Sequence, residues 1–413
     1  MRAGYGKSDI TPDAGTQMVG YGYEMNRPVE SVTDPLYCTC LSIMQEETLF
    51  FLFSFDLLRL SDQVIDDVRK SLQDRYGVFP QQVMMLATHT HTGPALDDSF
   101  GLGMADKQYV QELPERILAA AEKAFSDMRL VQGIRKVDQQ IAPIGYNRAI
   151  PGGPEDHAVR GVTLVIKDGM DIAIVSYNCH PVTMGPKRTV SADYPGRVVR
   201  ALEEEGIRAI YITGVCGDID PIINKAQWGS GTEETITEYG RRIANGFIRG
   251  QKEPVSTTAF KYGIIRQSLP LERLDYSRID AIVADAVANT QDSGFIRTVL
   301  GWAKVMRDGA GMAESEEGLT HYLCFDGFMI VAMNYEVFTA LGDRIRAAIP
   351  QMLTIVAGNA DKSLGYLPTA PKLKLGGYEA LESVFLYLRS PVAQGGAEIY
   401  TDRMVSELIQ ELD

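Results

Sequence analysis

Only five histidines occur among the 413 residues of the chain, and two of them lie in the segment His89-Thr90-His91. The segment follows a short apolar run that is typical of a buried strand. Residues two positions apart on an extended chain point the same way, so we expect both imidazoles to face one cavity. Histidine and carboxylate side chains are common zinc ligands, and a catalytic zinc keeps one position for water. The segment therefore predicts a metal site.

Three stretches of the chain share one predicted layout, at about 36–94, 162–221 and 322–366. Each has two strands, a polar residue, a helix, a third strand and a polar loop. The polar residues are Asp56, His180 and Glu336 in turn. Ligands of α/β sheets bind outside the carboxyl ends of the strands, so this layout would gather the polar groups around one site.

Two alternatives stay open at this point. Strand-helix-strand order is common, so the shared layout does not by itself establish an internal repeat. A single histidine or glutamate at the end of a strand is also compatible with a purely structural side chain. For Asp56, participation in the site is a hypothesis that rests on the layout alone.

The elements around these residues indicate an α/β fold with mixed sheets flanked by helices. We expect about three strand-strand-helix-strand units around one metal site. Apolar stripes predict further helices near 109–124, 236–247 and 279–287, and a terminal helix near 398–412. The length alone would suggest two or three domains. Because the motifs come from every part of the chain, we instead expect a single domain over 1–413.

The composition is that of an ordinary globular chain, with 45% hydrophobic and 23% charged residues, which argues against a disordered or fibrous protein. The net charge of −14 and the absence of a basic run argue against nucleic acid or an anionic membrane as partners. The longest apolar stretch, 49–55, is too short to span a bilayer. No feature of the sequence indicates a protein partner.

The chain does not open with the apolar segment of a secretory signal, so we expect a cytoplasmic location for the sequence as written. A secreted or periplasmic location would follow if an export signal has been removed. The five cysteines fit no zinc or disulfide framework, which favours buried thiols. The sequence also lacks the nucleophile elbow, the P-loop and the Rossmann glycine fingerprint.

Several motifs occur in the order that is typical of one enzyme family. They are the opening at 3–12, Ala87-Thr88-His89-Thr90-His91-Thr92-Gly93-Pro94, Tyr146-Asn147-Arg148, and His180 with the segment at 191–196. The segment Gly217-Asp218-Ile219-Asp220-Pro221 matches in part. Together they resemble the catalytic domain of the neutral, non-lysosomal ceramidases, from about residue 3 to residue 380.

This resemblance implies a zinc-dependent amidase with one zinc per chain. Its zinc ligands would be His89, His180, Glu336 and Tyr366. His91, Arg148 and Tyr378 match further active-site positions. The unperturbed pKa of a histidine suits His91 for proton transfer, and Tyr378 could donate a hydrogen bond to an oxyanion. An ordinary aromatic side chain near the sheet edge is the alternative for Tyr366.

Three features depart from the family pattern. Asp220 stands where the family has a serine, so a carboxylate is expected in the active site, where it could bind an amino or hydroxyl group or disfavour ceramide. The chain stops where large members continue into an immunoglobulin-like C-terminal domain. The stretch at 225–320 is short and lacks a strongly apolar loop for lipid chains.

The sequence thus predicts a zinc-dependent hydrolase that cleaves a C–N amide bond with a metal-activated water. Its substrate would be an N-acyl compound, either a ceramide-like lipid or a smaller polar molecule. A zinc esterase or deacetylase that uses the same site is one alternative. The other is a catalytically inactive homologue that binds a metal or a ligand.

Overall fold

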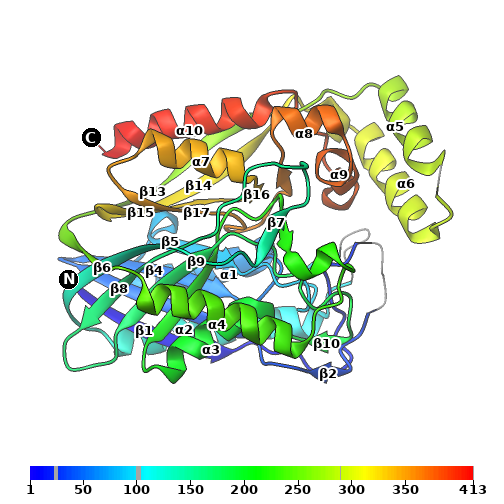
Figure 1. The fold of residues 1–413 in the computed structure, drawn as a ribbon. Coiled ribbons are helices and arrows are strands. Elements are labelled where there is room, and N and C mark those ends of the chain that lie inside the picture. The colour runs from blue at the N-terminus through cyan, green and yellow to red at the C-terminus, as the bar shows by residue number, and fades with distance from the viewer. Residues whose placement is uncertain (23–26, 99–103, 289, 413) are drawn as a thin grey trace.

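A computed structural model describes residues 1–22, 27–98, 104–288 and 290–412. The fold is mixed α/β, as the sequence predicts. Within the described residues, the largest sheet has twelve strands, and helices lie on its outer faces (Figure 1). Parallel and antiparallel pairs both occur in this sheet.

The three stretches with a shared layout have the same strand pairing. The first consists of β3 (Tyr37–Gln45), β4 (Thr48–Phe55), α1 (Asp62–Tyr76) and β5 (Val83–Ala87). The second consists of β8 (Ala158–Ile166), β9 (Ile172–Tyr177), α3 (Asp193–Glu204) and β11 (Arg208–Thr213). The third consists of β14 (Ser315–Asp326), β15 (Phe328–Met333), α7 (Thr339–Ala348) and β17 (Leu353–Ala357). In each, the first two strands pair antiparallel, and the strand after the helix pairs parallel with the second strand.

The remaining elements join these three units or cover them. The connecting strands are β1 (Arg2–Asp9), β6 (Arg129–Gln140) and β13 (Glu253–Pro270). Small two-stranded pairs are formed by β2 (Ser31–Val32) with β10 (Thr189–Val190), β7 (Gly145–Asn147) with β12 (Ile219–Pro221), and β16 (Glu336–Val337) with β18 (Tyr366–Leu367). The other helices are α2 (Lys107–Ser126), α4 (Glu233–Arg249), α5 (Tyr276–Ala288), α6 (Ser293–Arg307), α8 (Ala370–Leu375), α9 (Ser383–Tyr387) and α10 (Gly396–Leu412).

The first unit shows how the sequence sets these boundaries. Ser61 caps α1 by accepting a hydrogen bond from the amide of Val64, and Gly77 ends the helix in the left-handed conformation that glycine adopts without strain. The buried residues of α1 recur at helical spacing along one face. The preceding strand, β4, is buried along nearly its whole length, as a strand covered on both faces must be.

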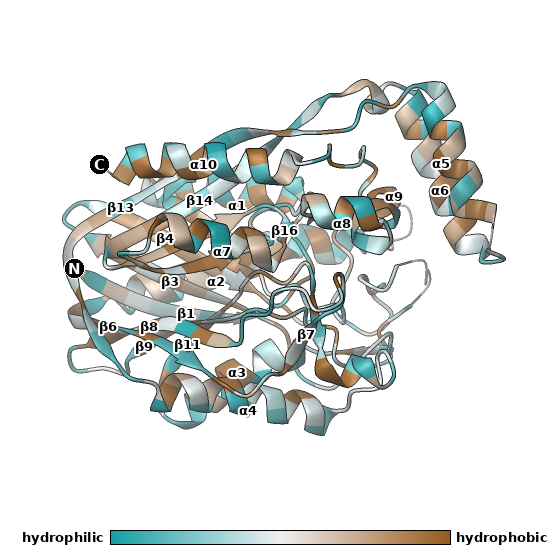
Figure 2. Cartoon of the chain, turned by 45° about the horizontal axis from the view of Figure 1, so that its top comes forward, coloured by the Kyte–Doolittle hydropathy of each residue, from teal (hydrophilic) through white to brown (hydrophobic). Residues whose placement is uncertain are grey.

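One hydrophobic cluster in the middle of the molecule draws on all three units. It contains Leu52 and Leu86 from the first, Ile174 and Ile210 from the second, and Ile330 and Ile355 from the third. Three other clusters fill the spaces under the outer helices, namely α1 and α2, α3 and α4, and α7 and α10. Figure 2 shows hydrophobic residues along the inner strands, and helices that are hydrophilic on one side.

The third strands of the units end close to one another. An isolated bridge joins Leu86 to Ala360, and a second joins Gly214 to Ala357. The amide of Ala87 also donates to the carbonyl of Asn359 over 3.1 Å. The loops that follow β5, β11 and β17 therefore meet at one edge of the structure, where a site can be built from all three units.

Helices α5 and α6 form a hairpin at one side of the molecule, beside α9 (Figure 1). The predicted helix near 279–287 corresponds to α5, whereas α6 does not follow from the sequence patterns we considered. None of the helices in the described part of the chain is long and apolar enough to cross a membrane.

Candidate metal centre

Three histidine side chains from two units converge in the interior. His89 and His91 lie in the loop after β5, and His180 follows β9. One ring nitrogen of each lies within 4.8 Å of those of the other two. His89 and His180 are buried, and His91 is partly buried. The segment at 89–91 thus meets the histidine of the second unit, although His91 and His180 are 89 positions apart in the sequence.

Hydrogen bonds to the backbone fix which nitrogen of each ring faces the centre. The Nδ1 atoms of His89, His91 and His180 donate to the carbonyls of Leu58, Gly20 and Cys216, respectively. A carbonyl can only accept, so Nδ1 carries a proton and Nε2 is the atom that faces the centre. Nε2 of His91 is buried and has no hydrogen-bond partner within the described part of the chain, and Nε2 of His89 contacts only Glu336 there. Histidines that bind metals are commonly oriented in this way.

Glu336, the first residue of β16, adds a carboxylate to this group. Its Oε2 lies 2.9 Å from Nε2 of His180 and 3.2 Å from Nε2 of His89. Its Oε1 accepts a hydrogen bond of 2.6 Å from the hydroxyl of Tyr387. These contacts are hydrogen bonds or ion pairs when Nε2 carries a proton, and a metal ion can take the place of that proton. The donor set therefore fits a divalent metal with nitrogen and oxygen ligands.

The electrostatic surroundings favour the forms of these groups that bind metals. Burial, together with the neighbouring His89 and His180, lowers the pKa of His91 well below its usual value. Burial and the charge of Arg148 also lower the pKa of His180. Burial alone would raise the pKa of Glu336, but the adjacent histidines hold it well below the usual range. Neutral imidazoles at His91 and His180 and an ionised carboxylate at Glu336 can bind a metal without first losing protons.

The backbone around His89 is held in an unusual conformation. Its φ is 68°, in the left-handed region that few non-glycine residues adopt. The extended geometry that we expect for the segment therefore does not hold at His89, even though both rings reach one centre. The hydroxyls of Thr90 and Thr92 donate to the carbonyl of Ser191 and fix the loop against the second unit. A Cβ at Gly20 would lie 2.9 Å from His91, so only glycine allows this close approach.

Tyr366 and Arg148 lie next to the histidines. Tyr366 pairs in register with Glu336 between β16 and β18, and its hydroxyl is 3.4 Å from Nε2 of His180. Nη2 of Arg148 donates to that hydroxyl over 2.9 Å. The ring of Tyr378 packs edge-on against Tyr366 with 5.7 Å between centroids. The structure therefore brings together three residues that the family resemblance indicates, namely Tyr366, Arg148 and Tyr378.

Asp220 stands where the family pattern has a serine, but its carboxylate is not free to bind a substrate. Its Oδ1 forms an ion pair of 2.7 Å with Nη1 of Arg148, and its Oδ2 accepts from the Asn224 amide over 3.1 Å. Burial alone would lower the pKa of Arg148, but the negative charge of Asp220, followed by Tyr366 and Glu379, raises it well above its usual value. The negative charge of Asp220 is therefore balanced inside the protein.

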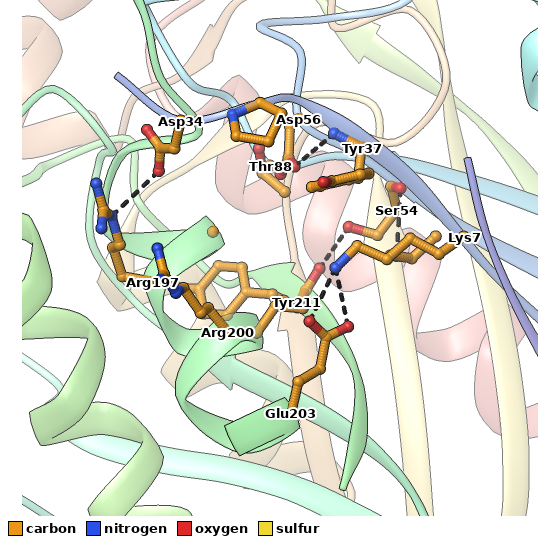
Figure 3. Close-up of a pocket in the computed structure, with 14 residues that line it drawn as sticks. Lys7, Asp34, Tyr37, Ser54, Asp56, Thr88, Arg197, Arg200, Glu203 and Tyr211 are labelled. Atoms are coloured by element: carbon orange, nitrogen blue, oxygen red, sulfur yellow. Dashed lines mark hydrogen bonds and ion pairs between the residues drawn. The ribbon is translucent and has the colours of Figure 1, made fainter. Parts of the chain in front are cut away.

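Asp56 lies away from the histidines, in a cavity of about 270 Å³. Strands of the first unit and α3 bound this cavity, and Asp56 lies there beside Tyr37 and Thr88 (Figure 3). One carboxylate oxygen of Asp56 accepts from the amide of Tyr37 over 2.9 Å. Among the described residues, no hydrogen bond or ion pair joins Asp56 to the histidines. The first unit contributes to the metal centre through the histidines of the loop after its third strand, and not through Asp56.

A larger cavity of about 850 Å³ opens beside the histidines. His91, Arg148, Asp220, Tyr366 and Tyr378 all line it. Sequence reasoning missed four other lining residues, Tyr21, Trp228, Lys372 and Glu379. It also missed Tyr387, which binds Glu336. Two of these residues had a signal. Tyr21 lies in Val19-Gly20-Tyr21-Gly22, which also resembles the family's opening, and Glu379 directly follows Tyr378. The others lie in segments without a recognisable motif.

The fold and the converging side chains define an α/β protein with a candidate metal centre. Its structure is similar to that of the neutral ceramidase from Pseudomonas aeruginosa, with a TM-score of 0.75 and 16% sequence identity, over 98% of this chain and 73% of that chain. It is also similar to a ceramidase complexed with C2, with a TM-score of 0.76 and 16% identity, over 99% of this chain and 75% of that chain.

The chain therefore has the fold of a neutral ceramidase over nearly its full length, which confirms at the level of fold the resemblance seen in the motifs. No protein-family model matches the sequence, and no match was found among curated proteins.

We expect the purified protein to bind about one zinc per chain, because the donor set fits one tetrahedral site. His89→Ala and His180→Ala should each lose most of this zinc, whereas His157→Ala should keep it, because His157 lies outside the group and pairs with Glu155. Metal analysis after dialysis measures the content. Full zinc in both cluster variants, or none in the zinc-supplemented wild type, would contradict the assignment.

We also expect the cavity at Asp56 to make stability depend on pH. Burial raises the pKa of Asp56 to about 7, whereas an unfolded aspartate titrates near pH 4. The folded state therefore binds this proton more tightly, and its stability falls as the pH rises from about 4 to about 7, by at most about 1.4 kcal/mol per pH unit. Asp56→Asn should reduce this slope in urea unfolding and be more stable than the wild type at pH 8.

The matched control is Asp66→Asn, which changes an exposed aspartate of α1. It should keep the wild-type slope. Equal slopes in the wild type and Asp56→Asn would contradict the raised pKa.

Proposed function

We propose that this protein is a zinc-dependent amidase that hydrolyses the C–N bond of an N-acyl substrate. The observation that carries this proposal is the convergence of three histidine ring nitrogens and Glu336 beside a large cavity. The fold shared with a neutral ceramidase supports the same reaction class, although a fold alone does not fix a function. We further propose that residues 1–413 act as one catalytic domain whose three units surround this site.

In this proposal, His89, His180, Glu336 and Tyr366 hold one zinc. When bound, zinc lowers the pKa of a coordinated water and polarises a carbonyl oxygen. Burial and the nearby Glu336 raise the pKa of Tyr366 well above its usual value, and Arg148, which donates to the Tyr366 hydroxyl, opposes that rise. Tyr366 would therefore bind the metal as a neutral hydroxyl unless the metal itself promotes loss of the proton. Glu336 keeps its orientation through Tyr387, which occupies its second oxygen.

His91 is the proposed proton-transfer residue. Its Nδ1 donates to Gly20, so Nε2 can accept a proton from the attacking water and then pass it to the leaving amine. The lowered pKa keeps His91 neutral, and therefore basic, at neutral pH. An amide needs this second step because an unprotonated amine is a poor leaving group.

Tyr378 is the proposed donor to the oxyanion. Its ring lies against Tyr366 and lines the cavity, so its hydroxyl is available to a bound acyl group. The guanidinium of Arg148 lies 5.9 Å from the centroids of both tyrosine rings and packs against them. Asp220 acts on this site through Arg148 rather than by direct contact with the reacting atoms.

A substrate panel tests this proposal. We expect the zinc-loaded wild type to release acid and amine from N-acyl compounds. His91→Ala should lose about 10²- to 10⁴-fold in kcat/KM, the usual contribution of a general base. It should also keep its zinc, because His91 is not one of the four proposed ligands. The panel contains a ceramide, short N-acyl amines and matched esters, with product release followed by mass spectrometry.

Cleavage of the esters alone would favour an esterase or deacetylase. No cleavage by a zinc-loaded protein would favour an inactive binding homologue. Loss of zinc in His91→Ala would instead place His91 among the ligands and remove it from proton transfer.

A further inference from the structure

A continuous series of polar contacts runs along one wall of the large cavity. Nζ of Lys372 contacts Oε2 of Glu379 over 2.9 Å, and Nε of Arg148 donates to Oε1 of the same carboxylate over 2.9 Å. Nη1 of Arg148 contacts Asp220 over 2.7 Å. These four side chains carry two positive and two negative charges, and all four line the cavity. The wall that they form is therefore electrically balanced.

The four charged groups are also nearly enclosed. Asp220 and Glu379 have 2% and 5% of their side chains exposed, and Lys372 has 8%. Arg148 is the most exposed of the four at 17%, and its three nitrogens donate to three different partners. The wall as a whole therefore offers a charged substrate group no net opposite charge, and a group that displaced one of these partners would leave a buried charge unpaired.

Asp220 has a second connection, which leads to the mouth of the cavity. Its Oδ2 accepts from the side-chain amide of Asn224, whose Oδ1 accepts from the backbone amide of Gly229 over 3.0 Å. The residue before Gly229 is Trp228, whose side chain lines the cavity and is about half exposed. Trp228 packs edge-on against Tyr21 with 5.4 Å between centroids. Asp220 thus connects Arg148 with the loop that carries Trp228.

We propose that Asp220 is a positioning residue that makes the site select uncharged N-acyl substrates. It does so by neutralising Arg148, and through Asn224 it also fixes Trp228 at the cavity mouth. This inference rests on the proposed amidase function and adds the substrate class to it. The favoured substrates are neutral molecules whose apolar part can pack on Trp228.

The structure offers three variants that separate the two connections. Asp220→Asn removes the negative charge and weakens the link to Asn224. Glu379→Gln removes the other carboxylate that binds Arg148 but leaves the connection to Trp228. Asn224→Ala cuts the connection to Trp228 but leaves all four charges. Asp66→Asn on the exposed face of α1 is the control with no expected effect.

The first measurement compares N-acetylethanolamine with N-acetylglycine, which share a two-carbon skeleton and differ in charge. In the wild type, kcat/KM should favour the neutral compound. Asp220→Asn and Glu379→Gln should each shift this ratio toward the anionic compound by about tenfold, equivalent to about 1.4 kcal/mol. Most of the shift should appear in KM. The ratio should not change in Asn224→Ala or in the control.

The second measurement does not depend on activity. The chain has two tryptophans, and Trp302 is fully buried, so quenching of fluorescence by acrylamide reports mainly on Trp228. Quenching should increase in Asp220→Asn and Asn224→Ala and stay at the wild-type level in Glu379→Gln.

The outcomes separate the role of Asp220 from the proposed amidase function. An unchanged substrate ratio in both charge variants would overturn the selection of uncharged substrates. Unchanged quenching in Asp220→Asn would overturn the positioning of Trp228. Absence of hydrolysis by the zinc-loaded wild type would contradict the proposed function itself, whereas the quenching result would still decide the positioning role.

Discussion

The structure around the candidate centre depends on holding several polar side chains together in the interior. One nitrogen from each of three histidines and a carboxylate oxygen of Glu336 point at one small volume. Burying such groups is costly unless their partners are fixed, so the rest of the protein must hold them in place. Backbone carbonyls orient each ring, Tyr387 orients Glu336, and two threonines fix the loop that carries His89 and His91. Preorganisation of this kind lets a metal bind without rearranging the protein.

Part of this arrangement could be predicted from the sequence, because strand patterns and short motifs are local. The apolar runs and caps predict the three units and most helices, and the His89–His91 motif indicates a metal site. Glu336 emerges from the shared layout of the units. Arg148, Tyr366 and Tyr378 depend on the family resemblance, since nothing in their local sequence distinguishes them from structural residues.

Other features lie beyond local sequence information because they depend on contacts between distant segments. Arg148 and Asp220 are 72 residues apart, and the pairing that neutralises Asp220 exists only in the folded chain. The left-handed backbone of His89 arises from packing against the second unit rather than from local preference. The same applies to Asp56, whose position after β4 matches the layout although its side chain enters another cavity. A shared layout fixes where a residue leaves a strand but not where its side chain points.

The distribution of the candidate ligands along the chain also bears on when a metal can be acquired. The proposed ligands begin at His89 and end at Tyr366, and they meet only where all three units contact one another. During synthesis, the first unit can fold as soon as it emerges, but it carries only one of the four. If these four residues hold the metal, tight binding requires the third unit to be in place. Metal loading would then report on assembly of the whole core, and a chain interrupted before residue 366 would lack one of the four.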